Sequence, residues 1–335
     1  DAKRHPGDEN VFEIQQGVAI SVFWTTPSSN DGVRLAHASA FGRRNEKYGL
    51  LSTIPSGIRY CPFSARPDFY LFETATQTVE TEEYKLWLKL DESMPFGGTG
   101  IITNRDGFVI DFEDTPILAR MRVFRDEKVP DAEAQRLLDL KENYTWKIPK
   151  ARKLFRADTD HNRLRDIDYR PFDRRRIYYQ KNVVYNPRFE TMAQAGPDNI
   201  FLLSCRQQFE TGFRHAFVTR QMFECCVVSA KSREKTYGFP LYVSSRGTEG
   251  GELFRSLQRV NYSQELREKF RRDLGVVIVD STHEKQDSEV SGQEVFNYFY
   301  SILSSPAYRG RYAENLKLEF PRLPVPSTMA LFRSL

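Results

Sequence analysis

Residues 291–310 read SGQEVFNYFYSILSSPAYRG, and this stretch carries the clearest local signals in the chain. Ser291, followed three residues later by Glu294, makes a capping box, which predicts a helix through Leu303. Ser305–Pro306 predicts the start of a second helix, because the missing N–H of proline costs nothing in a first helical turn. The proline-rich run FPRLPVP at 320–326 then favours extended backbone.

Upstream of this stretch, helical and strand-like segments are mixed along the chain. Helical periodicity is found at Glu82–Leu90, Pro116–Arg125, Asp131–Lys141 and Ser263–Leu274. Strand-like runs are found at Arg176–Tyr185, Asn199–Cys205, Ala216–Val228 and Phe239–Ser244. We therefore expect an α+β fold with mixed strands.

The N-terminal region predicts a β-hairpin followed by a helix. Val11–Thr25 is apolar and β-branched around Gly17, as in a buried strand. The turn-rich loop Thr26–Gly32 separates it from a second predicted strand at Val33–Phe41. Arg43–Leu51 has the pattern of a short amphipathic helix.

The composition excludes several protein classes. No apolar run in the 335 residues approaches the ~20 needed to span a bilayer, and the charged N-terminus lacks a signal-peptide core. The four cysteines show no paired zinc spacing and only five histidines are present, so we expect no metal site. Because the cysteines also form no disulfide framework, we expect the protein to be located in the reducing cytoplasm. Cys225 and Cys226 lie in an apolar run and are expected in the core. Because the chain starts at Asp1 rather than Met, we expect a fragment of a longer polypeptide.

The positive charge is concentrated in one region, although the net charge is only +4. Between Trp146 and Arg188 there are 13 Lys and Arg against 5 Asp. Arginine suits bidentate contacts to phosphate and guanine. Aromatic residues lie among these cations, and rings combined with guanidinium planes favour nucleic acid over a small anion. These aromatic residues are Tyr169, Phe172, Tyr178, Tyr179 and Tyr185.

Two other functions are compatible with the sequence. Pro67–Asp68, followed by Glu83 and Lys85, matches the residues that hold Mg²⁺ and assist the attacking water in a class of nucleases. That pattern needs a hairpin of strands, whereas Glu82–Leu90 has helical periodicity. The second alternative is a non-enzymatic protein-interaction module, for which the basic region is only a solvated face.

The glycine-rich segment Phe96–Asp106 does not complete a dinucleotide fingerprint, because Thr103 stands where a third glycine is expected. It is compatible with a phosphate cradle, a loop that presents Asn104 and Arg105, or a tight turn. Enzymes that methylate adenine also need an Asn/Asp-Pro-Pro-aromatic tetrapeptide, and this chain contains no Pro-Pro. We therefore expect no cofactor site and no catalysis by this chain alone.

Several segments, in order along the chain, resemble type ISP restriction-modification enzymes. Asn10–Ile20 resembles the strand that follows the catalytic motif of that family, and Arg43–Lys47 resembles its next landmark. The resemblance covers essentially the whole chain. The remaining matching segments are Gly100–Phe108, Tyr169–Asp173, Ile177–Tyr179, Ser204–Gln207, Phe239–Tyr242, Val295–Tyr300, Ser305–Arg309 and Phe320–Pro324.

The resemblance implies a division of the chain into two parts. Residues 1–54 would be the terminal β-hairpin and helix of a Rossmann-like, adenine-specific DNA methyltransferase domain, and residues 55–335 a target-recognition domain. The S-adenosylmethionine loop and the catalytic tetrapeptide would lie upstream in the same polypeptide, as would any motor or nuclease domain. The implied partner is double-stranded DNA.

Such a domain grips phosphates for affinity and reads base edges for sequence. For phosphate contacts we predict Lys150, Arg152, Lys153, Arg174 and Arg188. For base readout we predict Asn104, Arg105, Arg175, Arg206 and Gln207. Residues shared by enzymes with different targets, such as Arg170–Asp173, do not distinguish those targets. The residues that do so are expected at 156–165 or 244–259.

Overall fold

The computed structural model describes residues 7–12, 18–23, 34–53, 59–63, 79–160, 163–209, 212–244, 258–280, 286 and 288–335. The chain divides into two compact units, Asp1–Gln77 and Thr78–Leu335. The domain boundary predicted after residue 54 falls inside the first unit. Within the described ranges, every helix is too short or too polar to cross a membrane.

The described residues of the first unit form one short helix and one pair of strands. Helix α1 (Arg44–Ser52) is held to the preceding chain by Lys47, whose ammonium group pairs with Asp8 at 2.7 Å and donates to the Glu9 carbonyl at 2.6 Å. Strand β1 (Leu35–His37) pairs antiparallel with β2 (Cys61–Phe63). The helix predicted at Arg43–Leu51 is therefore confirmed.

The predicted N-terminal hairpin is not confirmed, although β1 lies within its second predicted strand, Val33–Phe41. Residues 18–23 form no strand, and the side chains of Ile20 and Val22 are 78% and 72% exposed rather than buried. Strand β1 pairs with β2, which lies later in the sequence. A two-stranded ladder offers too little apolar surface to bury a third segment, so β-branched composition alone does not make a buried strand here. Residues 13–17 and 24–33 lie outside the described part.

The second unit is organised around an antiparallel sheet with the strand order β4-β11-β8-β9. The central strand β8 is buried along its whole length: Leu202 belongs to one hydrophobic core, and Phe201 and Leu203 belong to another. Because side chains alternate between the two faces of a strand, this sheet separates two cores. Its strands are β4 (Gly98–Thr99), β8 (Phe201–Cys205), β9 (Phe217–Thr219) and β11 (Thr236–Pro240).

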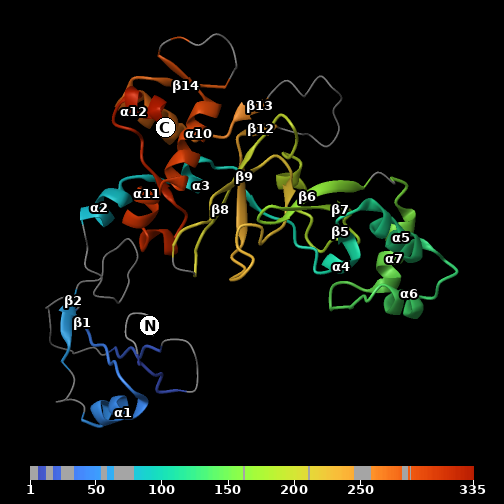
Figure 1. Ribbon diagram of the computed structural model, residues 1–335, viewed down its shortest axis with the longest axis horizontal. Coiled ribbons are helices and arrows are strands. Elements are labelled where there is room, and N and C mark those ends of the chain that lie inside the picture. The colour runs from blue at the N-terminus through green and yellow to red at the C-terminus, as the bar shows by residue number, and fades with distance from the viewer. Residues whose placement is uncertain are drawn as a thin grey trace. The chain divides into compact units, whose positions relative to one another are not determined.

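The first core is mainly C-terminal (Figure 1). Its helices are α2 (Val79–Lys85), α3 (Leu90–Ser93), α9 (Gln264–Leu274), α10 (Gly292–Ser304), α11 (Pro306–Arg311), α12 (Met329–Ser334) and a 3-10 turn at Asn315–Lys317. Its two-stranded ladders are β3 (Leu88–Lys89) with β16 (Arg322–Leu323), β12 (Tyr242–Ser244) with β13 (Gln258–Val260), and β14 (Val277–Val279) with β15 (Glu289–Ser291).

Both helices predicted from residues 291–310 are confirmed. The Ser291 hydroxyl accepts a hydrogen bond from the Glu294 N–H at 3.2 Å, and the Glu294 carboxylate accepts one from the Ser291 N–H at 2.7 Å. Ser305 caps α11, which begins with Pro306. The local signals therefore decided where these helices start.

The second core combines a four-stranded sheet with helices. The sheet has the order β10-β6-β7-β5, with β10 parallel to β6 and the other pairs antiparallel. Its strands are β5 (Ile110–Asp111), β6 (Leu164–Arg170), β7 (Asp173–Tyr178) and β10 (Met222–Phe223). Its helices are α4 (Asp106–Val109), α5 (Asp114–Arg125), α6 (Asp131–Leu137), α7 (Ile148–Ala157) and α8 (Phe189–Met192). The predicted α+β class with mixed strands is confirmed.

The glycine-rich segment serves close packing of the central sheet. A Cβ at Gly100 would lie 2.5 Å from the backbone of Glu224, and a Cβ at Gly97 would lie 2.6 Å from the Phe239 ring. Only glycine admits neighbours this close. The close approach of the Phe239 ring and of the Glu224 backbone therefore explains these two glycines without a phosphate cradle.

Candidate nucleic-acid interface

The candidate interface is built on helix α7, which starts beside a group of basic and aromatic residues. Ile148, Ala151 and Phe155 are buried, and their spacing places them on one helical face. Pro149 occupies the first turn, and the Glu142 carboxylate accepts a hydrogen bond from the Ile148 N–H at 2.7 Å. The opposite face leaves Lys150 and Lys153 exposed. Burial of the apolar face therefore directs lysines outward.

A cleft of about 750 Å³ lies beside the start of α7. Three segments line it: Gly97–Thr99 around β4, residues 145–154 of the α7 region, and residues 181–191, which follow β7 and include α8. Gly97 and Gly98 lie along its wall. Segments far apart in sequence thus converge on one depression in the second unit.

Positive charge dominates the lining of this cleft. Lys147, Lys150, Lys181 and Arg188 line it, whereas Glu190 is the one carboxylate among the described residues of the lining. Lys147 is paired with Glu142 at 3.3 Å. Lys150, Lys181 and Arg188 form no ion pair with a residue in the described ranges. Three cations are therefore available to a polyanion.

Aromatic and amide side chains also line the cleft, among these cations. Tyr185 and Phe189 line the cleft with 49% and 47% of their surfaces exposed. Asn182 and Asn186 add amide groups to the lining. Aromatic faces can stack on bases, and asparagine amides can pair with base edges. The cleft therefore offers the contact types that nucleic acid needs.

Arg105 supports the cleft wall from behind instead of facing a ligand. It is 8% exposed, and its guanidinium lies 3.7 Å from the centre of the Trp146 ring, which lines the cleft. Burial lowers the pKa of Arg105 to about 10, so it stays charged at neutral pH. The Trp146 indole N–H donates to the Asn182 carbonyl at 2.8 Å. The geometry thus does not support the predicted base contact by Arg105, because its planar face is covered by the indole.

The position of Arg152 does not fit the phosphate contact that the sequence predicts for it. The side chain is 1% exposed and donates to the carbonyls of Phe124 at 2.8 Å, Asp126 at 2.5 Å and Val129 at 2.9 Å. It also pairs with Asp131 at 2.5 Å. The guanidinium therefore links α7 to the connection between α5 and α6. Because it is buried in these contacts, it is not accessible to a phosphate.

Arg174 and Arg175 lie on β7, where carboxylates neutralise much of the positive charge. Arg174 is largely exposed and pairs with Asp168 at 3.3 Å. Arg175 pairs with Asp173 at 2.8 Å and stacks over Tyr169 at 4.3 Å. The structure thus supports a base contact by Arg175 less than the sequence does, since its guanidinium already has a charge partner and a ring partner.

The other predicted residues do not join a single site. Lys150 and Arg188 lie together in the cleft, whereas Asn104, Lys153 and Arg206 are exposed outside its lining. Gln207 is exposed and donates to the Leu318 carbonyl at 3.2 Å.

The stretches expected to discriminate targets are only partly described. Arg156 donates to the Arg125 carbonyl at 2.8 Å, and Arg163 pairs with Asp158 at 3.0 Å. Residues 161–162 and 245–257 lie outside the described part. Their role in discrimination stays a prediction.

The sequence missed six cleft residues, namely Trp146, Lys147, Lys181, Asn182, Asn186 and Phe189. The sequence contains a signal for some of them: Lys181 and Asn182 are separated from the end of strand β7 by two residues, in a short segment rich in amide and aromatic side chains. Polar and aromatic residues grouped at the end of a strand are a common mark of a binding loop.

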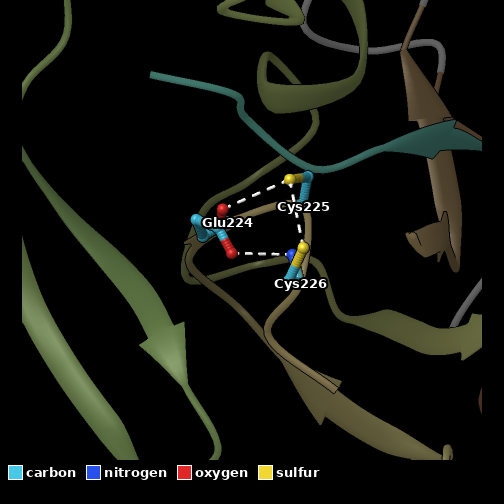
Figure 2. A group of neighbouring side chains, drawn as sticks. All are labelled: Glu224, Cys225 and Cys226. Carbon is cyan, nitrogen blue, oxygen red and sulfur yellow. Dashed lines mark hydrogen bonds between the residues drawn. The ribbon is translucent and has the colours of Figure 1, made fainter. Parts of the chain in front are cut away.

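Glu224, Cys225 and Cys226 bring one carboxylate and two thiols within 4.8 Å of one another (Figure 2). Burial and the Glu224 carboxylate raise the pKa of the Cys225 thiol far above its usual value, so this thiol is protonated at neutral pH. The Glu224 carboxylate pairs with Arg170 at 2.7 Å and accepts from the Cys226 N–H at 2.6 Å. Because metals bind thiolates rather than thiols, this group fits a structural brace better than a metal centre.

The nuclease alternative lacks its required geometry. Glu83 and Lys85 lie on helix α2 rather than on a strand. The Glu83 carboxylate accepts hydrogen bonds from Arg311 and from the Tyr312 hydroxyl, each at 3.1 Å. Asp68 lies outside the described residues. A helix does not supply the strand hairpin that the metal-binding pattern needs.

Residues 92–335 match the family described as the Type ISP C-terminal specificity domain. The chain belongs to this family. The matched residues contain the central sheet and every residue that lines the cleft, so the candidate interface lies inside the specificity domain. The resemblance noted in the sequence is thereby confirmed. Among curated proteins, none matches this chain.

Three solved structures share the fold, and each match covers 85% of this chain. A cryo-EM structure of a DrdV–DNA complex is 21% identical with a TM-score of 0.54, over 28% of that chain. The ATP-dependent Type ISP restriction-modification enzyme LlaBIII, bound to DNA, is 14% identical with a TM-score of 0.56, over 18% of that chain. A nuclease-deletion mutant of the Type ISP enzyme LlaGI, in complex with a DNA substrate mimic, is 17% identical with a TM-score of 0.50, over 21% of that chain. This chain thus spans less than a third of their length.

Proposed function

We propose that this chain recognises a specific base sequence in double-stranded DNA, as the specificity portion of a restriction-modification adenine methyltransferase. The observation that carries the proposal is the basic, aromatic-lined cleft inside a Type ISP specificity domain. Solved structures with similar folds are complexes with DNA or with a DNA substrate mimic. The family and the chemistry of the cleft therefore favour the same class of partner.

The cations and the exposed rings of the cleft favour duplex DNA as the partner over a protein. The cations Lys150, Lys181 and Arg188 can replace counterions along a phosphate backbone. A solvated basic face has no need for exposed rings between its cations, whereas Tyr185 and Phe189 interrupt this one. The cleft is therefore a better fit for nucleic acid than for a protein-interaction module.

We divide the candidate DNA-binding residues into those that contact phosphates and those that read bases. We assign phosphate contacts to Lys150, Lys153, Lys181 and Arg188, which are basic side chains on or beside the cleft. For base readout we keep Asn104, Arg206 and Gln207, whose side chains are exposed. Asn182 and Asn186 join this set because they line the cleft.

Methylation would require residues beyond these 335. We propose that a methyltransferase region of the same polypeptide supplies the S-adenosylmethionine site and the catalytic tetrapeptide, since this chain has no Pro-Pro. The first unit exposes Ile20, Val22 and Phe23 to solvent, and such side chains would be covered by a neighbouring domain. Motor or nuclease domains would be further parts of that polypeptide.

The first test is selection of the purified chain against a randomised duplex library at two salt concentrations, followed by sequencing. We expect recovery of one short motif whose enrichment survives the higher salt. Binding that enriches nothing and fades with salt would contradict sequence reading by this chain. No binding even at low salt would contradict DNA recognition and favour a protein-interaction module.

The second test removes cations from the cleft. Lys150→Gln combined with Arg188→Gln should weaken binding to the selected duplex, and the slope of log K against log salt should fall by about 0.9 for each lost phosphate contact. Lys128→Gln is the matched control, because Lys128 is exposed and lies outside the cleft. Equal salt slopes for the double variant and the control would exclude the cleft as the phosphate-binding surface.

A further inference from the structure

The hairpin of β6 and β7 ends in a very tight turn (Figure 1). Arg170 pairs with Asp173, so the turn consists of Pro171 and Phe172 alone. The register shifts between Asp168 and Arg170, which leaves Tyr169 in a β-bulge. Phe172, in this turn, is 99% exposed.

A phenylalanine at position 172 does not favour the stability of the fold. Its φ is +62°, in the left-handed region that is an outlier for a bulky residue. Proline at the first turn position and positive φ at the second describe a turn that favours glycine or asparagine at the second position. Among the described residues, the ring that it contacts is that of Phe217, edge-on, at 5.9 Å between ring centres. Neither the backbone nor the packing therefore explains a phenylalanine at this position.

The end of the hairpin next to the turn is held in place on both strands. Arg170 pairs with Glu224 at 2.7 Å and stacks on Tyr169 at 3.9 Å. Arg175, on the other strand, also stacks on Tyr169, and Asp168 accepts a hydrogen bond from Thr219. The Glu224 group of Figure 2 is thus one anchor of this end of the hairpin. These contacts hold the residues on both sides of the turn that carries Phe172, and a supported position of this kind is suited to binding.

One exposed cation lies beside the ring. The four Arg from Tyr169 to Arg176 are each paired with a carboxylate, but they differ in how far solvent reaches them. Arg174 is the most exposed of these cations and lies two residues from the ring. A flat apolar ring next to exposed arginine fits a stack of bases between two phosphate backbones.

We propose that Phe172 is a wedge that inserts its ring between two stacked base pairs of the bound duplex. The inference rests on the proposed function, since it requires DNA as the partner. Insertion partly unstacks one base step and bends the duplex, and the additional contacts of the bent duplex offset the cost of unstacking. The ring stacks on any base, so this contact distorts DNA without reading it. A contact that does not depend on sequence suits Phe172, because Tyr169–Asp173 is a segment that resembles enzymes with different targets.

The test uses the full chain and the duplex recovered by selection, with 2-aminopurine placed at each position in turn. Stacked 2-aminopurine is quenched, so insertion raises its fluorescence at one base step. We expect this rise with the unaltered chain and with Phe172→Trp, and its loss with Phe172→Ala together with a tenfold or greater weakening of binding. Phe23→Ala, which removes a ring exposed in the first unit, is the matched control and should keep the rise.

The outcomes separate this inference from the proposed function. Duplex binding with no unstacked step, or an unchanged rise with Phe172→Ala, would overturn the wedge and leave DNA recognition standing. The hairpin tip would then face a protein partner. An absence of duplex binding by the unaltered chain would overturn both.

A stability measurement excludes a merely structural role. Phe172→Gly should leave the melting temperature unchanged or higher, because glycine accepts positive φ, while abolishing the fluorescence rise. A lowered melting temperature in both Phe172→Gly and Phe172→Ala would mean that the ring stabilises the fold, and would contradict the wedge.

Discussion

At the scale of single residues, neighbouring cations on α7 have opposite roles. Lys150 and Lys153 are exposed, whereas Arg152 is 1% exposed. Arg152 lies four residues after Ile148 and three before Phe155, so it shares their buried face. A buried guanidinium is tolerable only because backbone carbonyls and Asp131 satisfy it.

Arg152→Met should therefore destabilise the protein strongly. The loss would leave the carbonyls of Phe124, Asp126 and Val129 without their donor in the interior, at a cost of roughly 3 kcal/mol. Urea unfolding followed by circular dichroism measures the change. The neighbouring change Lys153→Met, at an exposed site, should stay within about 0.5 kcal/mol of the original. Equal stability of the two variants would contradict the structural role of Arg152.

At the scale of elements, short-range signals decide helix starts. Helix α10 begins at a reciprocal pair of hydrogen bonds between Ser291 and Glu294. The Ser263 hydroxyl likewise caps α9, by accepting a hydrogen bond from the Leu266 N–H at 3.2 Å. Such caps act within one turn, so they are visible in the sequence without any knowledge of the fold.

Ser291→Ala should lower the free energy of unfolding by about 1 kcal/mol, because the Glu294 N–H loses its acceptor. Urea denaturation of the full chain measures it, with Ser288→Ala as the control, since Ser288 is exposed and lies outside the helix. If the Ser291 variant unfolds at the same urea concentration as the control, the cap does not stabilise α10.

At the scale of the whole molecule, the second unit contains both hydrophobic cores and the cleft. We expect residues 78–335 to fold without the first unit. The shortened chain should show one cooperative thermal transition with the midpoint of the full chain, because no described residue of the first unit belongs to either core. It should also bind the selected duplex as the full chain does. Aggregation or a broad, non-cooperative transition would show that the first unit completes the fold.

The success of sequence reasoning depended on the range of the interactions. Helices α5 and α9 agree with predicted segments because apolar spacing and caps are local. Helix α7 was missed, although Ile148, Ala151 and Phe155 have helical spacing, because the intervening cations suggested a surface strip. The N-terminal hairpin is not confirmed: β1, inside its second predicted strand, pairs with β2, and strand pairing depends on partners distant in sequence.

The candidate site shows the same division. Lys150 and Arg188 were predicted and do lie in one cleft, whereas Arg105 and Arg152 were predicted and are buried. All four occur in basic or polar surroundings in the sequence, and nothing local separates them. Burial follows from which face of an element meets a neighbour, and that neighbour is distant in the chain.

The sequence by itself determined the fold class, the helix starts at Ser263, Ser291 and Ser305, and the family to which the chain belongs. These depend on local hydrogen bonding and on the order of segments. Only the tertiary structure decided which cations face solvent and that the exposed ring of Phe172 sits at the tip of a hairpin. The reason is physical: a charge is buried only when distant backbone groups satisfy it, and a ring is exposed only when no distant segment covers it.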